Sequence, residues 1–123
     1  MSQDVVADGL NEIMNAKKAK KQEVILKKHS KLLIGILGIM KEMGYLDYKI
    51  EKNELKVKIK NLNMAKAIKP RYTVSVKKIN FYVRRFLPAK NFGFIIISTN
   101  KGLMKDKEAE EKNLGGCLIA YIY

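Results

Sequence analysis

Residues 92–123 read FGFIIISTNKGLMKDKEAEEKNLGGCLIAYIY. Their hydrophobic pattern predicts a buried strand, a short polar turn, a helix, a double glycine and a second strand. The polar turn is Ser98-Thr99-Asn100-Lys101-Gly102. It places hydroxyls, an amide and one cation where a strand passes into a loop, and loops held by rigid scaffolds often carry binding groups. Such a set suits a polyanion that presents ribose and base edges, and it contains no acid or base for catalysis.

The charge of the chain is strongly positive and unevenly distributed. Its 25 lysines and arginines outnumber its 12 acidic residues, which gives a net charge of +13. After Glu54 the next acidic residue is Asp106, and 13 of the 25 basic residues lie between them. These are Lys56, Lys58, Lys60, Lys66, Lys69, Arg71, Lys77, Lys78, Arg84, Arg85, Lys90, Lys101 and Lys105. A long stretch with only positive charges implies that a binding partner supplies the negative counter-charge. This favours nucleic acid as the partner, with an anionic membrane surface or an acidic protein as alternatives.

Length and composition bound the class of protein. The 123 residues allow one domain or two small ones, and 47% hydrophobic residues are enough for a packed core. The single cysteine, Cys117, excludes an intramolecular disulfide and fits a reducing compartment. Residues 1–20 do not resemble a signal peptide, and the longest apolar run, 32–40, is too short to span a bilayer. We therefore expect a soluble intracellular protein.

The first half of the chain predicts the element order α-β-α-β-β. A helix is expected over 4–16 with Asp4 at its start, followed by a strand over 23–26. Ser30 is positioned to cap a second helix, and Gly44 stands where that helix is expected to stop. Residues 45–52 and 54–60 then form a hairpin that turns at 52–53, with Leu55, Val57 and Ile59 alternating with lysines.

The second half is expected to be mainly β. Residues 61–66 are interpreted as a linker, and 68–76 as a strand or extended segment. Residues 81–89 are ambiguous, because Pro88 disfavours regular structure at their end. The predicted fold is α+β, with an N-terminal α-β-α-β-β unit packed on a mainly β C-terminal unit that has one short helix. The N-terminal α/β subdomain is placed at 1–64, and the β-rich RNA-binding subdomain at 65–123.

Several other patterns favour structure over chemistry. Residues 35–38 have the GxxG spacing of an RNA-clamping loop but lie within a helical pattern, which favours close helix packing. His29 is interpreted as a loop residue, and one histidine with one cysteine does not make a metal site. Cys117 begins an apolar strand, which favours a packed thiol over a nucleophile. Glu108, Glu110 and Glu111 are interpreted as one solvated helix face, with Glu108 near the N-terminal end of the helix. The 100–102 turn lacks the glycine spacing of a phosphate loop, so we expect no nucleotide hydrolysis, no metal and no cofactor.

The same residues carry a resemblance to a known family. The matching groups are Ser98 to Gly102, Met104, Glu108-Ala109, Gly115-Gly116, Ala120-Tyr121, Ala7-Asp8, Leu10, Ile13, Asn15-Ala16, Ser30-Lys31, Met43-Gly44-Tyr45, Ile68-Lys69-Pro70-Arg71 and Leu87-Pro88-Ala89 before Phe92-Gly93. Together they resemble the universal small-subunit ribosomal protein eight family, and the last two groups are most similar to its archaeal and eukaryotic branch.

The resemblance implies a protein without catalysis that binds the central domain of small-subunit rRNA directly and helps its assembly. It also implies neighbouring ribosomal proteins as partners, a cytoplasmic location in the small subunit, and neither a membrane nor a small-molecule substrate. The expected RNA-binding residues are Ser98, Thr99, Asn100, Lys101, Gly102, Gly115, Gly116, Lys69, Arg71, Arg84, Arg85, Lys90 and Lys31. Two alternatives stay open: an assembly factor or translational regulator that uses the same basic face, and an enzyme acting on RNA or nucleotides. The second is disfavoured by the lack of a His/Glu/Asp cluster in the basic region.

The chain departs from the family pattern at four places. Asn100 stands where serine is usual, and Cys117 replaces a residue that is usually charged or polar. Lys105 occupies the position of a Ser or Thr helix cap, so Asp106 is expected to take over that role. The loop at 52–53 is shorter than in most archaeal and eukaryotic relatives.

Overall fold

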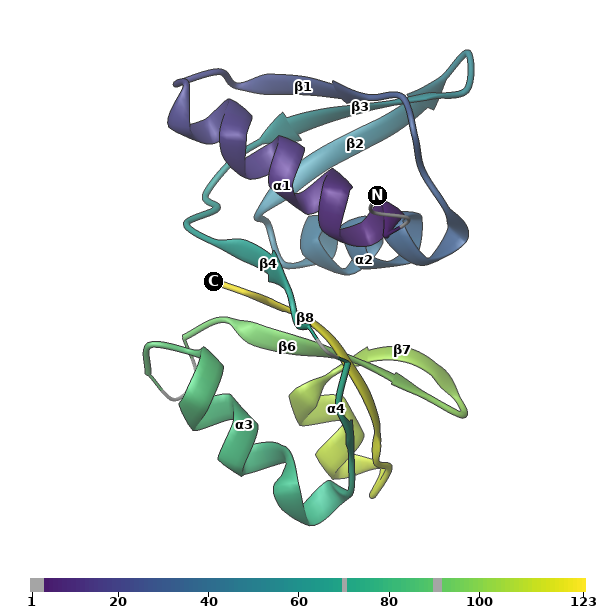
Figure 1. Ribbon diagram of the computed structural model, residues 1–123, viewed down its shortest axis with the longest axis vertical. Helices are drawn as coiled ribbons and strands as arrows, with labels where there is room; N and C mark the ends of the chain where they lie inside the picture. Colours follow the sequence, from purple (N-terminus) through teal and green to yellow (C-terminus); the bar gives the residue numbers. More distant parts are fainter. Residues whose placement is uncertain (1–3, 70, 90–91) are drawn as a thin grey trace. The chain divides into compact units, whose positions relative to one another are not determined.

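The computed structural model describes residues 4–69, 71–89 and 92–123, and the chain divides into two compact units, Met1–Ala65 and Lys66–Tyr123. Each unit combines helices with an antiparallel sheet (Figure 1), so the predicted α+β class is confirmed.

The N-terminal unit has the predicted order α1 (Val5–Lys18), β1 (Glu23–Leu26), α2 (Lys31–Glu42), β2 (Leu46–Glu51) and β3 (Glu54–Ile59). Both predicted N-caps are confirmed. An Asp4 carboxylate oxygen accepts the Ala7 N–H at 3.1 Å, and the Ser30 hydroxyl accepts the Leu33 N–H at 3.2 Å. Helix α1 runs two residues beyond the predicted end at 16. The strands pair in the order β1-β3-β2, and both helices cover one face of this sheet (Figure 1).

The turns of this unit follow from local backbone chemistry. Gly44 has a φ of +82° just after α2, a left-handed conformation that glycine adopts without steric cost. Lys52 and Asn53, at the hairpin tip, have φ values of +49° and +64°. Positive φ at both central residues defines the type I′ turn, whose twist matches that of paired strands. The hairpin predicted at 52–53 is confirmed.

The C-terminal unit is built around a larger sheet. Its elements are β4 (Ala65–Ala67), β5 (Thr73–Val74), a 3-10 helix η1 (Val76–Lys78), α3 (Ile79–Phe86), β6 (Phe94–Thr99), β7 (Gly102–Lys105), α4 (Asp106–Glu111) and β8 (Gly116–Ile122). The strands run in the order β4-β8-β6-β7, and β5 pairs with the beginning of β8. The core of the unit contains Ile79, Val83 and Leu87 from α3 and its end, and Ala109 from α4. They pack with side chains of β5 to β8, including Ile95, Ile97, Met104 and Leu118.

Two predictions for this half are wrong. The ambiguous 81–89 segment is largely the helix α3, so the unit has two α-helices and not one. Ile79 and Val83 lie four residues apart and are both buried, which is the helical period. The helical period was not predicted because the segment is rich in β-branched and aromatic residues, which are more common in strands. Of the strand expected over 68–76, only the two residues of β5 are in strand conformation. The structure also has a strand that was not predicted, β7, which begins at the last residue of the polar turn.

Asp106 is the one charged side chain that is buried among the described residues. The cap position of α4 is Lys105, which makes no side-chain cap bond, so the prediction that Asp106 becomes the N-cap is wrong. Asp106 is instead the first helical residue, and its carboxylate accepts the Ile95 N–H of β6 at 3.1 Å. Burial raises the pKa of the Asp106 carboxyl, and the Ile95 hydrogen bond partly offsets this.

We predict that Asp106→Asn leaves the protein at least as stable as the native chain at neutral pH. The folded-state pKa lies above the ordinary 3.8, so the ionised carboxylate opposes folding. Its contribution is most favourable below that ordinary value and is lost as the pH rises through the folded-state pKa. Asparagine keeps the acceptor for Ile95 without the charge, whereas Asp106→Ala should cost about 1–3 kcal/mol. Urea unfolding of the Asp106→Asn and Asp106→Ala variants beside the native protein, at about pH 3 and at about pH 7, measures the stability of each. An Asn variant that is less stable at pH 7 would show that the charge itself stabilises the fold.

Candidate nucleic-acid interface

The polar turn joins β6 to β7 with two exposed residues, Asn100 and Lys101. The Thr99 hydroxyl donates to the Gly102 carbonyl oxygen at 2.9 Å and accepts the Lys101 N–H at 3.1 Å. Thr99 therefore shapes the turn from within. Gly102 has a φ of +112°, which explains a glycine at this corner. Neither Ser98 nor Asn100 has a side-chain hydrogen bond to any residue that the structure describes.

Ser98 belongs to a row of side chains that crosses the sheet. Its strand partners are Leu103 on β7 and Cys117 on β8, and Cys117 in turn pairs with Thr73 on β5. Directly opposed residues of antiparallel strands point to the same face. Thr73 is exposed, and Ser98, Leu103 and Cys117 are half-buried. Sequence reasoning missed Thr73, because only the register of the sheet brings it beside Ser98.

Gly115 and Gly116 allow three strands to approach one another closely. A Cβ on Gly116 would lie 2.3 Å from the Ser98 carbonyl oxygen, and one on Gly115 would lie 2.5 Å from the Val74 carbonyl oxygen. Real Cβ atoms essentially never come this close to backbone. The two glycines therefore place the beginning of β8 against Ser98 and β5, and the predicted turn and double glycine meet at one end of the sheet.

The predicted basic residues are not all at this end. Arg84 and Arg85 are exposed on α3, which packs on the core face of the sheet, whereas the Ser98 row is on the other face. Both arginines lie in the segment that was ambiguous in the sequence and is helical in the structure. The Arg85 guanidinium lies 5.9 Å from the Tyr72 ring centroid and 5.6 Å from that of Phe86.

The remaining basic candidates are scattered. Lys69 and Arg71 are exposed in the connection between β4 and β5. Lys31 is exposed at the start of α2 in the N-terminal unit, and Lys90 lies outside the described residues. By sequence, the C-terminal unit has twelve lysines and arginines against four acidic residues, a net charge of +8. All four acidic residues lie within Asp106–Glu111, the residues of α4.

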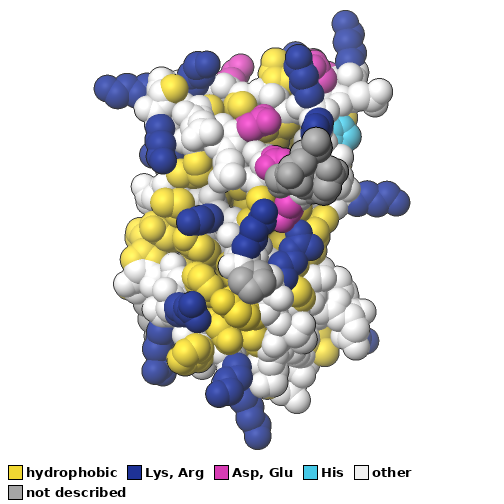
Figure 2. All heavy atoms as spheres, viewed as in Figure 1, with side chains coloured by type: hydrophobic (Ala, Val, Ile, Leu, Met, Phe, Trp, Pro, Cys, Tyr) yellow, Lys and Arg dark blue, Asp and Glu magenta, His cyan; other side chains and the backbone are white. Residues whose placement is uncertain are grey.

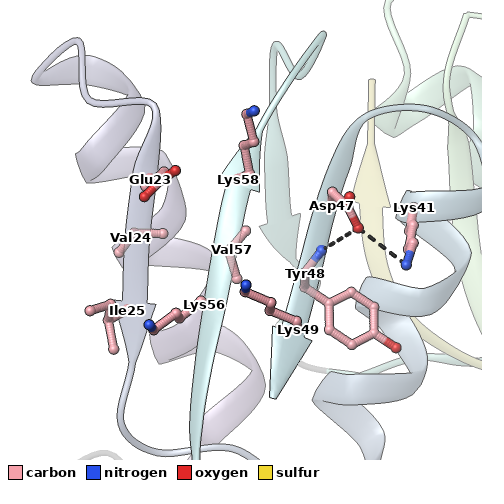
Figure 3. A pocket seen from close by; sticks show the side chains of 10 residues that line it. All are labelled: Glu23, Val24, Ile25, Lys41, Asp47, Tyr48, Lys49, Lys56, Val57 and Lys58. Carbon is pink, nitrogen blue, oxygen red and sulfur yellow. Dashed lines mark hydrogen bonds and ion pairs between the residues drawn. The ribbon is translucent and has the colours of Figure 1, made fainter. Parts of the chain in front are cut away.

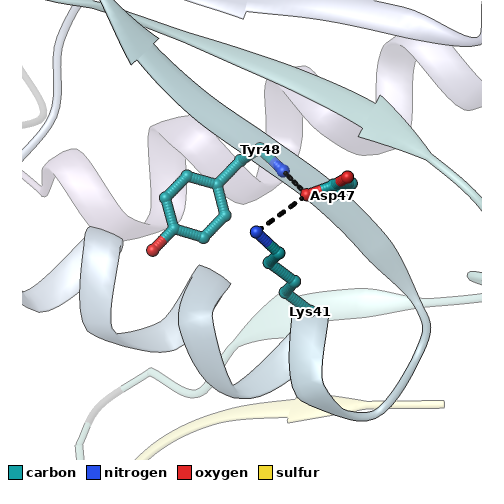
Figure 4. A network of polar contacts seen from close by, with 3 residues as sticks. All are labelled: Lys41, Asp47 and Tyr48. Carbon is teal, nitrogen blue, oxygen red and sulfur yellow. Dashed lines mark hydrogen bonds and ion pairs between the residues drawn. The ribbon is translucent and has the colours of Figure 1, made fainter.

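The outer face of the N-terminal sheet offers a hollow lined by lysines (Figure 3), and three of these lysines form ion pairs. Lys56 and Lys49 contact the Glu51 carboxylate at 2.8 and 3.0 Å. Hydrogen bonds from Lys56 and then Lys49 lower the pKa of Glu51 to about 2. Lys41 contacts Asp47 at 3.1 Å and lies over the Tyr48 ring (Figure 4). The Lys41 hydrogen bond, followed by the one from the Tyr48 N–H, lowers the pKa of Asp47. This face supplies its own counter-charges and has little positive charge left for a polyanion.

The described residues include no candidate metal centre. Among residues 4–69, 71–89 and 92–123, no group of three or more His, Cys, Asp or Glu side chains is placed to hold a metal ion. The described helices include none that is long and apolar enough to cross a membrane. Gly35 and Gly38 lie within α2 and His29 lies in a loop, both as predicted. The His29 Nε2 lies 3.0 Å from the Asn53 carbonyl oxygen. Cys117 is half-buried in β8.

A basic α+β unit has the features of a nucleic-acid-binding protein when its surface turn combines a half-buried hydroxyl with an exposed amide and an exposed lysine. The chain belongs to the ribosomal protein S8 family, whose model matches residues 4–123. It is 37% identical to the small ribosomal subunit protein uS8 of Nanoarchaeum equitans and 36% identical to that of Archaeoglobus fulgidus. Both alignments span 129 positions and cover the whole of each chain. The family resemblance inferred from the sequence is confirmed, and the family is one of ribosomal proteins and not of enzymes.

Proposed function

We propose that this chain is a structural constituent of the small ribosomal subunit in the cytoplasm, where it binds rRNA of the central domain directly and helps its assembly. Family membership supports the ribosomal role. The observation that carries direct RNA binding is the polar turn, where Ser98 and Asn100 make no side-chain hydrogen bond to described residues. Its partners are then small-subunit rRNA and neighbouring ribosomal proteins.

The turn offers each kind of contact that RNA requires. The Ser98 hydroxyl and the Asn100 amide both donate and accept, and this suits ribose 2′-hydroxyls and base edges. Lys101 supplies a positive charge for phosphate. Gly102 carries no side chain that would keep RNA from the backbone, whereas Gly115 and Gly116 contribute by packing β8 closely against Ser98 and β5. Thr99 holds the turn in shape through its two hydrogen bonds.

The basic residues differ in the kind of RNA contact that this proposal gives them. Lys101 belongs to the turn, whereas Arg84 and Arg85 belong to α3 on the core face of the sheet. We assign Arg84, Lys69 and Arg71 to phosphate contacts, which position RNA without reading its sequence. Arg85 is not assigned to a phosphate, because its guanidinium lies over the Tyr72 and Phe86 rings.

We predict that the affinity for RNA falls steeply as salt concentration rises. Each neutralised phosphate releases counterions, so about 5 to 8 contacts should give a slope of several log units of K per log unit of salt. A filter-binding titration with a central-domain rRNA fragment measures this slope. A nearly flat dependence would remove the electrostatic part of the proposal.

A further inference from the structure

Five aromatic rings form a continuous row in the C-terminal unit, which we name the aromatic ladder. Its members in spatial order are Tyr123, Tyr121, Phe86, Tyr82 and Tyr72. Neighbouring centroids are 5.3–6.3 Å apart, and neighbouring ring planes differ by 13–27°. Residues from β8 and the position after it, from α3 and from the segment before β5 meet in this row, which packs against the core.

The aromatic ladder continues to the surface. All five of its rings are half-buried, and two further phenyl rings extend it. Phe81 contacts Tyr82 edge-on with centroids 5.1 Å apart, and Phe92 contacts Tyr123 at 5.9 Å. Phe81 and Phe92 keep 58% and 48% of their surface exposed. Exposed aromatic rings grouped in this way mark an interaction surface more than a core. Figure 2 shows hydrophobic side chains gathered on this unit among Lys and Arg side chains.

The charge around the aromatic ladder is positive. Arg85 lies over both Tyr72 and Phe86, within the range of a cation–π contact. Lys77, Lys78 and Arg84 are exposed on η1 and α3, and the sequence has no acidic residue between Glu54 and Asp106. A partner for this face must combine negative charge with flat apolar groups.

We propose that the aromatic ladder, with Phe81, Phe92 and Arg85, is a second RNA-contacting surface that takes unpaired bases of single-stranded RNA. Bases supply the flat groups and phosphates supply the charge. Base–aromatic stacking is tolerant of sequence because every base has a π-face, and a flat guanidinium such as that of Arg85 adds to it. This surface is distinct from the Ser98 row, which lies on the face of the sheet opposite to the core side chains. The proposal rests on the proposed RNA-binding function but requires RNA of a different kind, one with splayed bases.

The chain has a built-in probe for this contact. It contains six tyrosines and no tryptophan, and four of the tyrosines belong to the aromatic ladder. Stacked bases quench tyrosine fluorescence, so a single-stranded oligouridylate of about ten nucleotides should quench a large part of the emission. The full-length chain is used, with a base-paired RNA hairpin as a second ligand.

Variants separate stacking from charge and from folding. Phe81→Ala removes the most exposed ring and should weaken oligouridylate binding about fivefold or more while leaving hairpin binding and the thermal melt unchanged. Arg85→Lys keeps the charge and should weaken oligouridylate binding without changing the salt slope. Ile25→Ala is the matched control, since Ile25 is 49% exposed on β1 of the other unit. This variant should bind both the oligouridylate and the hairpin with native affinity.

The outcomes distinguish this proposal from the proposed function. Hairpin binding without quenching by oligouridylate, or oligouridylate binding that is unaffected by Phe81→Ala, would overturn the second surface and leave the first intact. Loss of small-subunit association on Phe81→Ala, with both RNAs bound normally, would identify the aromatic ladder as a protein-docking face and would also overturn the proposal. Failure of every RNA to bind the native chain would contradict the proposed function itself.

Discussion

Gly116→Ala should lower the free energy of unfolding by about 3 kcal/mol, because the new methyl group has no room. Its Cβ would lie 2.3 Å from the Ser98 carbonyl oxygen and 3.0 Å from Ile97 Cγ2. The nearer atom is backbone in the paired strands β6 and β8, so relief requires the strands to separate and their hydrogen bonds to weaken. Chemical denaturation of the full-length variant measures the loss.

Gly38→Ala is the matched control for this substitution. A Cβ at Gly38, inside α2, would lie 3.7 Å from the Tyr48 hydroxyl, which is ordinary contact. Alanine within a helix should therefore stabilise the protein by about 0.5–1 kcal/mol. Equal stability of the Gly116→Ala and native proteins would contradict the close strand approach. Because Gly116 places Ser98, lost RNA binding in this variant would not by itself show that RNA touches the glycine.

Ser98→Ala and Asn100→Ala should each weaken binding to central-domain rRNA about tenfold or more. Each substitution leaves an RNA group desolvated without its partner, which costs about 1–3 kcal/mol. Neither side chain has a hydrogen bond to the described residues, so the thermal melt should stay nearly unchanged. The salt slope should also be unchanged, because no charge is removed.

Thr99→Val provides the contrast within the same turn. It removes the hydroxyl that bonds to the Gly102 carbonyl oxygen and to the Lys101 N–H. We expect it to lower both stability and RNA affinity, whereas Ser98→Ala and Asn100→Ala lower affinity alone. Native affinity in the Ser98 and Asn100 variants, with intact folding, would show that the turn is structural and that RNA binds elsewhere on the basic face.

The sequence predicts the fold best where local chemistry is sufficient. Asp4, Ser30 and Gly44 mark helix ends through their own hydrogen bonds and φ values, and the structure agrees at all three. Local patterns fail for α3, where Phe81, Tyr82 and Phe86 give a segment that resembles a strand by composition. Its helical state depends on packing of Ile79 and Val83 against the core, a tertiary effect that propensity does not contain.

The candidate site shows the same division. The turn residues 98–102 are contiguous, so their grouping is visible in the sequence. The position of Thr73 and Cys117 beside Ser98 depends on strand register, and a slip of one residue would turn each side chain to the other face. The separation of Arg84 and Arg85 from the turn depends on α3 packing on the opposite face. The count of positive charges in the sequence had placed Arg84 and Arg85 on the same basic face as the turn.

The central claim, direct and specific binding of small-subunit rRNA, is tested most directly by one ratio of affinities. The dissociation constant of the native full-length chain is measured for a central-domain rRNA fragment and for a shuffled RNA of the same length, at the same physiological salt. Phosphate contacts alone bind both RNAs equally, so any difference reports recognition by groups such as Ser98 and Asn100. We predict that the central-domain fragment binds about a thousandfold more tightly than the shuffled RNA. Equal affinity for the two RNAs would contradict it.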